Sequence, residues 1–127
     1  MNAELDDGLR KWGADVDGAL NRFLHNETMY VAFLNKFVAG PEMPALKAAL
    51  RQPVPKSEAQ DIAHTLKGVA GNLGLNPLYN LYMKINDSIK NSDFSGIDSM
   101  YASAEEQFIS LCKLLETAGN KTSEAMP

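Results

Sequence analysis

Residues 63–74 read AHTLKGVAGNLG, and this stretch near the middle of the chain predicts one helix with a chemical face and an apolar face. With an advance of about 100° per residue, the residues within about 60° of His64 are Ser57, Gln60, Lys67, Gly68 and Gly71. The apolar side chains expected on the opposite side are Ile62, Leu66, Val69 and Leu73. The pattern therefore predicts an exposed histidine halfway along a helix, followed by a lysine within one turn.

Signals on either side of this stretch predict where the helices begin and end. Ser57 and Gln60 have the spacing of a capping box, which indicates that the central helix begins there. Gly74 can adopt the left-handed conformation that closes a helix. Asn76 and Pro77 then predict the cap and the first turn of the next helix, so the break between two long helices takes only a few residues.

The N-terminal third contains helix boundaries of the same kind. Asp15 or Asp17 predicts the cap of a short second helix, because a carboxylate accepts from the unpaired amides of a first turn. Asn26 predicts the cap of a third helix, and Pro41 suits the first position of a fourth.

Apolar residues recur at helical spacing in each of these segments, and no alternating strand pattern or internal repeat is present. We therefore expect an all-α bundle with four principal helices and short additional N-terminal helices. Within it we expect an N-terminal helical extension over residues 1–14, the bundle over 15–118 and a frayed polar tail over 119–127.

Size and charge narrow the classes of function. A chain of 127 residues has room for one hydrophobic core. The net charge of -4, without a clustered run of Lys and Arg, argues against nucleic acid as a partner. No apolar run is long enough for a membrane span or a secretory signal, so we expect a cytoplasmic protein without membrane insertion.

The glycines near His64 indicate more than packing. Gly68 and Gly71 each cost about 0.5–1 kcal/mol relative to alanine inside a helix, and both are expected on the solvent side. Glycine beside an exposed histidine leaves room for another protein or for a bulky adduct on the imidazole. A loosened helix end would also explain Gly71, and would explain Gly68 less well. Lys67 could compensate the charge of an anion such as phosphate on the nucleophilic imidazole.

These residues carry a resemblance to a known family. From His64 to Gly74 the chain resembles the signature H-x-L-K-G-(small)-(small)-x-x-L-G of histidine-containing phosphotransfer (HPt) domains. The similarity extends from about Asp15 to Leu115. Val69 is a departure, because members of the family often have Ser or Ala there. We expect Val69 to point inward, so that the departure concerns local packing more than phosphotransfer.

The resemblance implies an antiparallel four-helix bundle whose exposed histidine accepts a phosphoryl group from an aspartyl phosphate on one receiver domain and passes it to another. It implies that His64 is the phosphoacceptor, that Lys67 lies near the phosphoryl group and that Gly68 leaves room for the partner. Gln60 and Gly71 are the expected docking residues. The expected partners are receiver domains of a hybrid histidine kinase or a response regulator, with Mg²⁺ on the receiver, no cofactor or metal on this chain, and a monomeric state.

Other functions remain as alternatives. A helical adaptor could bind receivers without phosphotransfer, although it would have no need of His64, Lys67 and Gly68 together. A metal or haem bundle would use His25 and His64, but the Glu-x-x-His and Cys-x-x-Cys-His motifs are missing. The glycines of the central stretch lack the Gly-Lys-Ser/Thr ending of a P-loop and follow no predicted strand, so we expect no kinase activity.

Overall fold

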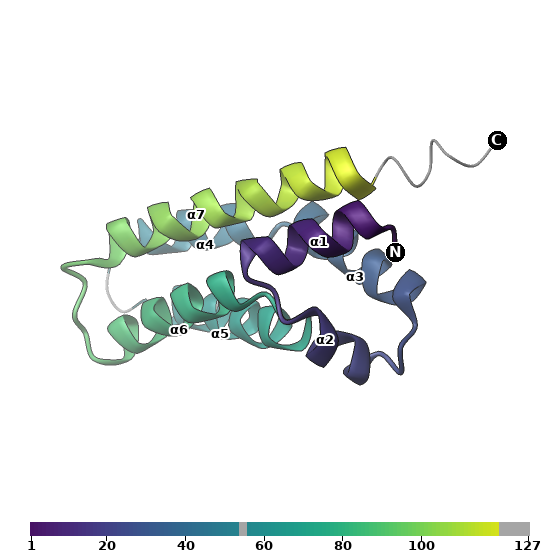
Figure 1. The fold of residues 1–127 in the computed structure, drawn as a ribbon. Coiled ribbons are helices and arrows are strands. Elements are labelled where there is room, and N and C mark those ends of the chain that lie inside the picture. The colour runs from purple at the N-terminus through teal and green to yellow at the C-terminus, as the bar shows by residue number, and fades with distance from the viewer. Residues whose placement is uncertain (54–55, 120–127) are drawn as a thin grey trace.

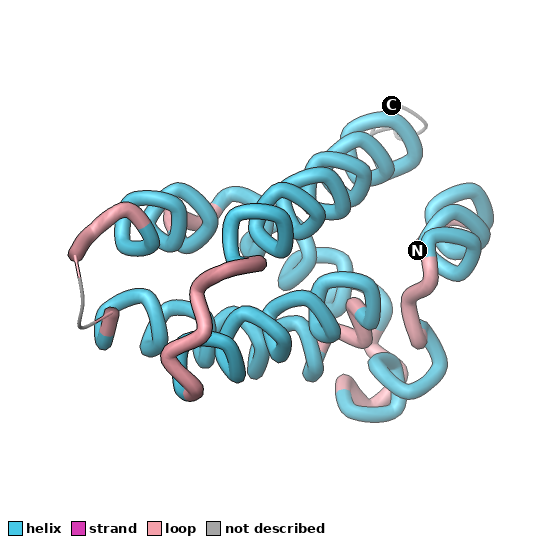
Figure 2. Tube along the Cα trace, turned by 90° about the vertical axis from the view of Figure 1, so that its left-hand side faces the viewer, coloured by secondary structure: helices cyan, strands magenta, loops and turns pink. Residues whose placement is uncertain are grey.

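The computed structural model describes residues 1–53 and 56–119, which fold almost entirely into helices. The elements are α1 (Ala3–Trp12), α2 (Val16–Arg22), α3 (Glu27–Ala39), α4 (Glu42–Leu50), α5 (Ser57–Asn72), α6 (Asn76–Lys90), α7 (Ile97–Leu114) and the π-helical turn η1 (Leu115–Gly119). No strand occurs among these residues, which confirms the predicted all-α class (Figures 1 and 2). The predicted tail lies outside the described residues from position 120 onward.

The bundle is formed by α4 to α7, and the chain reverses its direction at each connection between them. Figure 1 shows α4 and α7 in one layer and α5 and α6 in the other. α6 packs against both α5 and α7, and α4 packs against α5. The largest fully buried side chains come from several helices and include Tyr30, Tyr82, Leu34, Leu46, Leu66, Leu78, Ile85 and Leu111. This confirms the antiparallel four-helix bundle with additional N-terminal helices.

The first helix covers part of α7 and the turn that follows it. Leu5 and Leu9 are buried, and the indole Nε1 of Trp12 donates to the side-chain oxygen of Gln107 at 2.9 Å. Asn2 also donates to the carbonyl of Ala118 at 2.6 Å. α1 is therefore part of the core of the molecule.

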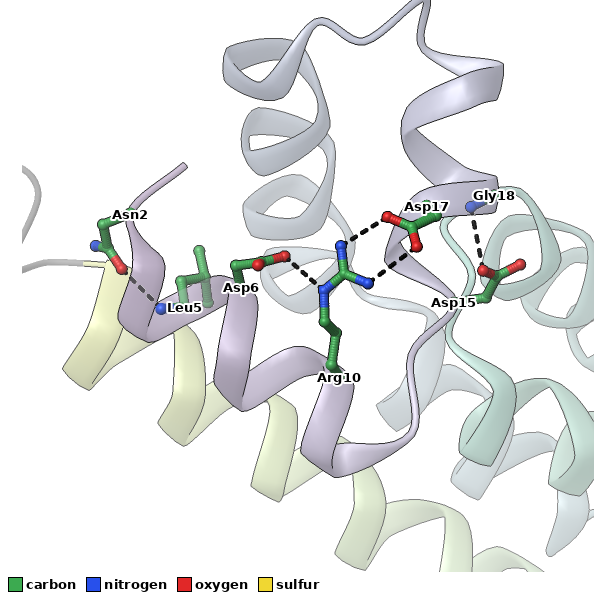
Figure 3. Close-up of polar contacts among 7 residues, drawn as sticks. All are labelled: Asn2, Leu5, Asp6, Arg10, Asp15, Asp17 and Gly18. Carbon is green, nitrogen blue, oxygen red and sulfur yellow. Dashed lines mark hydrogen bonds and ion pairs between the residues drawn. The ribbon is translucent and has the colours of Figure 1, made fainter.

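The second helix is tied to the first by a single arginine. The guanidinium of Arg10 donates to both carboxylate oxygens of Asp17, at 2.7 and 3.1 Å, and to Asp6 of its own helix at 3.0 Å (Figure 3). Asp15 caps α2 by accepting from the amide of Gly18, as one of the two predicted caps would. Arg10 thus adds a side-chain link between α1 and α2.

The predicted caps are right at some helix ends and wrong at others. Asn26 caps α3, as expected, and accepts from the amide of Met29 at 3.0 Å. Pro41 lies one position before its predicted place, since α4 begins at Glu42. Asn76 is the first helical residue of α6 and does not cap it, because the backbone of Leu75 occupies the cap position.

The capping box predicted for α5 is also absent. Ser57 is the first helical residue, and the cap position belongs to Lys56, which makes no side-chain cap bond. The Lys56 ammonium donates instead to the carbonyls of Leu50 and Gln52, at 2.7 and 2.6 Å, and so closes the end of α4. The start of α5 was predicted correctly, but the interaction expected to set it does not form.

No helix in the described part of the chain combines the length and the apolar character that crossing a membrane requires.

Candidate functional site

The buried face of α5 consists mainly of small residues. The core-facing positions are Ala59, Ala63, Leu66, Ala70 and, just past the helix, Leu73. The expectation that Val69 points inward is wrong, because 37% of its surface is exposed. Alanines allow α5 to approach α6 closely, so the buried face is rotated by about 50° from the face marked by the larger apolar residues.

His64 is exposed in the middle of α5, as predicted. It lies about 140° around the helix from the centre of the buried face, and Gly68 lies about 180° from it. Both residues therefore project from the outer surface, one turn apart. An imidazole in this position can be reached by a group on another protein.

Gly68 is surrounded by open space. Apart from the backbone of its own helix and its two chain neighbours, a Cβ atom placed on Gly68 would meet no atom of residues 1–53 and 56–119 within 4 Å. Packing inside the molecule therefore does not require glycine at this position. The missing side chain instead leaves the surface next to His64 free for a partner.

Lys67 is half-buried on the flank of α5 that faces α6. It follows His64 by three positions, a spacing that brings two side chains together on one helix surface. Its flexible stem can carry the ammonium group towards an anion on the imidazole.

Gln60 and Gly71 lie on the same flank, where the structure gives Gly71 a packing reason. A Cβ atom on Gly71 would lie 3.3 Å from the ring of Tyr79 on α6, a tight contact. The guanidinium of Arg22 donates to the carbonyls of Gly71 and Asn72, each at 2.9 Å, and so binds the end of α5 to α2. Gln60 is half-buried one turn before His64.

The other flank of α5 borders an apolar groove that sequence reasoning missed. The groove has a volume of about 300 Å³ and lies between α5 and the α2–α4 segment. Its lining includes Phe23, Phe33, Phe37, Thr65, Val69 and Asn72. The sequence signal was present in Val69, a branched apolar residue where the family often has a small one.

Two aromatic residues extend this surface away from His64. The rings of Phe23 and Phe33 pack at 5.4 Å between centroids, and Phe33 is 44% exposed. Met29, one turn before Phe33 on α3, is 45% exposed. We call the exposed side chains of Met29, Phe33 and Val69 the apolar surface.

Metal ligands do not gather at this site or elsewhere in the described residues. No group of three or more His, Cys, Asp or Glu side chains there is arranged to hold a metal ion. His25, the other histidine, lies in the turn between α2 and α3 with a positive φ of 60°.

Comparison with known protein families gives one match. The family model described as Hpt domain matches residues 39–118, which is more than half of the chain. The matched part contains α4 to α7 together with His64, Lys67, Gly68, Gln60 and Gly71. The searches of curated proteins and of solved structures found no match.

Proposed function

Because this chain belongs to the Hpt domain family, whose members carry phosphoryl groups on histidine in phosphorelays, we propose that His64 is its phosphoacceptor. It accepts the phosphoryl group from an aspartyl phosphate on one receiver domain and passes it to another receiver. The observation that carries the proposal is the pairing of an exposed histidine with open space over Gly68 one turn away.

The proposed step is an in-line displacement at phosphorus. A ring nitrogen of the neutral His64 imidazole donates its lone pair to the phosphorus and forms an N–P bond. The bond between phosphorus and the carboxylate oxygen of the aspartate breaks, and the carboxylate leaves with the bonding electrons. The other ring nitrogen keeps its proton. Transfer to the second receiver is the same displacement in reverse.

The chain contributes a positioned nucleophile and a local charge to this step. Buried α5 alanines hold the helix against α6, so His64 is presented from a rigid element. The Lys67 ammonium compensates part of the negative charge on the phosphorylated imidazole. Gly68 leaves room for the receiver's active site.

The partner supplies the remaining groups. Mg²⁺ bound by the receiver neutralises the oxygens of the transferred phosphoryl group, and this chain binds no cofactor of its own. The chain acts as a relay intermediate without kinase activity. It works as a monomer and binds each receiver transiently, because one receiver must leave before the next can dock.

We further propose that the receiver docks on the apolar surface and on the groove beside His64. A partner that brings its phosphoryl group to His64 also covers the neighbouring α5 flank, where Thr65 and Val69 line the groove. Exposed apolar side chains in a continuous patch are typical of protein interfaces. Gln60 and Gly71 then form the opposite, more polar rim of the docking site.

The test is transfer from a phosphorylated receiver. Receiver domains from the source genome are phosphorylated with a small-molecule donor, mixed with this chain and sampled for acid-labile, alkali-stable phosphate. We expect the wild-type chain to be labelled and His64→Gln to remain unlabelled. Label that persists on the His64→Gln variant would refute the assignment of the phosphoacceptor.

The same assay separates the relay from a helical adaptor. An adaptor would bind receivers with micromolar affinity in titration calorimetry and yet take no label from any of them. Its affinity would also be the same for wild type and His64→Gln. Binding without labelling across the whole set of receivers would therefore replace the relay by the adaptor.

A further inference from the structure

Leu24, in the turn between α2 and α3, combines full exposure with an unfavourable backbone conformation. Its side chain is 88% exposed, about twice the exposure of any other exposed large hydrophobic residue in the described part of the chain. Its φ is 54°, in the left-handed region that favours Gly or Asn. Neither burial nor backbone preference explains a leucine at this position.

The turn that presents Leu24 is held by several hydrogen bonds. The amide of Leu24 donates to the carbonyl of Asn21 at 3.2 Å, and the next amide, that of His25, donates to Leu20 at 2.7 Å. Arg22, two positions before Leu24, binds the last carbonyls of α5. The position of Leu24 is therefore fixed relative to the helix that carries His64.

Leu24 directly follows a residue that lines the apolar groove. The preceding residue, Phe23, packs on Phe33 and lines the groove together with Val69. Gly71, which Arg22 contacts, is seven positions after His64, a distance of about 10 Å along α5. A partner of ordinary interface size, about 800 Å² on each side, reaches both ends of this surface.

We propose that Leu24 is an anchor that inserts into an apolar pocket of the receiver docked over His64, and that Arg22 positions it. This inference rests on the proposed phosphotransfer function. A receiver is the occupant because the groove lined by Phe23, next to Leu24 in the sequence, is also lined by Thr65, next to the phosphoacceptor His64. Leu24 precedes residue 39, so the anchor lies outside the part of the chain that the Hpt model matches.

The decisive variant is Leu24→Asn, because its effects on folding and on docking have opposite signs. Asparagine tolerates the left-handed conformation, so we expect an unchanged or higher melting temperature. Removal of an interface anchor typically weakens binding by about tenfold or more. We therefore expect the receiver concentration for half-maximal transfer to rise about tenfold, with the maximal transfer rate unchanged.

Three controls accompany this variant. Phosphoramidate, a small donor that needs no docking surface, should label His64 at the same rate in wild type and Leu24→Asn. Ile109→Asn removes a 47% exposed apolar residue from α7, which lies in the layer opposite to that of α5 (Figure 1). This substitution should leave transfer from the receiver unchanged. Arg22→Met keeps Leu24 but removes the bonds from Arg22 to the end of α5. It should therefore accelerate amide exchange around Leu24 and also raise the receiver concentration for half-maximal transfer.

The outcomes separate this inference from the function on which it rests. If receivers label wild type and Leu24→Asn at the same half-maximal concentration, the anchor is refuted and the relay function stands. If phosphoramidate labels the chain but no receiver does, both fail. If light scattering detects a wild-type dimer that Leu24→Asn abolishes, the anchor belongs to a contact between copies and the inference is overturned.

Discussion

Gly68 lowers the helix propensity of α5 in a place where no packing contact requires glycine. We expect Gly68→Ala to raise the free energy of unfolding by about 0.5–1 kcal/mol, since alanine is the better helix former and its Cβ meets open space. Gly68→Gln should fold as well as wild type and transfer phosphate from a receiver at least tenfold more slowly, because its side chain fills the partner's space. Urea unfolding and single-turnover transfer measure the two effects.

Gly71 provides the matched control for Gly68. The Cβ of Gly71→Ala would press on the Tyr79 ring at 3.3 and 3.4 Å, so the gain in stability should be smaller or absent. A Gly68→Gln variant that receives phosphate at the wild-type rate would contradict the clearance role. Equal stabilisation by alanine at both positions would contradict the packing role given to Gly71.

Asn86 is a polar residue inside the core of α6. It is 2% exposed, and its side-chain oxygen has no hydrogen-bond partner within the described part of the chain. A buried acceptor without a donor costs about 1–3 kcal/mol, whereas an apolar side chain of similar size at the same position has no such cost. We expect Asn86→Leu to raise the free energy of unfolding by about 1 kcal/mol, measured by urea unfolding. A loss of stability would show that the carboxamide has a partner when the protein is in solution.

At the scale of single helices, the sequence predicts which segments are helical better than it predicts what they contact. The Asn26 cap and the left-handed Gly74, with φ of 71°, depend on local chemistry and are confirmed. Asn76 is not the cap of α6, because Leu75 occupies the cap position. The chain just before it is also bound from the start of α2, where the amide of Asp15 donates to the Gly74 carbonyl at 2.8 Å. A contact between residues so far apart in sequence leaves no local signal.

The rotation of α5 shows the same limit for the site. Ile62 and Val69 are more hydrophobic than alanine, so the prediction placed the buried face of α5 on their side of the helix. The observed buried face is centred elsewhere. Alanine is buried where two helices pack closely, as at Ala63 and Ala70, and only the structure reveals which partner helix allows this. His64 and Gly68 were still predicted correctly as exposed, because both lie far around the helix from the predicted and from the observed centre of the buried face.

An exposed ion-pair cluster around Arg10 links α1 to α2 (Figure 3). The Arg10 guanidinium lowers the pKa of the Asp17 carboxyl below its ordinary value. Because the folded pKa is the lower one, the pair contributes above about pH 4 and is lost as the pH falls further. We expect Arg10→Met to lower the melting temperature slightly at pH 7, with the difference shrinking in acid.

Salt provides the second check on this cluster. Exposed charges are screened at high ionic strength, so the difference between wild type and Arg10→Met should also shrink in about 1 M salt. At low salt, the Arg10→Met substitution should leave phosphoryl transfer to His64 unchanged. A difference in melting temperature that persists at both low pH and high salt would mean that Arg10 acts through packing of its stem.

At the scale of the whole molecule, buried tyrosines connect helices of the fold through their hydroxyl groups. The hydroxyl of Tyr30 on α3 donates to the carbonyl of Leu73 at the end of α5, at 2.9 Å. The hydroxyl of Tyr101 on α7 donates to the carbonyl of Met43 on α4, at 3.2 Å. These bonds join helices that are distant in the sequence, so their loss affects the cooperative unfolding of the entire bundle.

This arrangement predicts how the domain unfolds in alkali. Burial raises the pKa of Tyr30 to about 12 and also raises the pKa values of Tyr82 and Tyr101. Since an unfolded tyrosine loses its proton near pH 10, the free energy of unfolding is fully retained below about pH 10 and falls as the pH rises towards about 12. Tyr30→Phe should lose about 1 kcal/mol at pH 8, because the Leu73 carbonyl loses its donor, and should then show a shallower alkaline decline. Urea unfolding of both proteins between about pH 8 and pH 12 measures the two slopes, and parallel slopes would contradict a titrating, buried Tyr30.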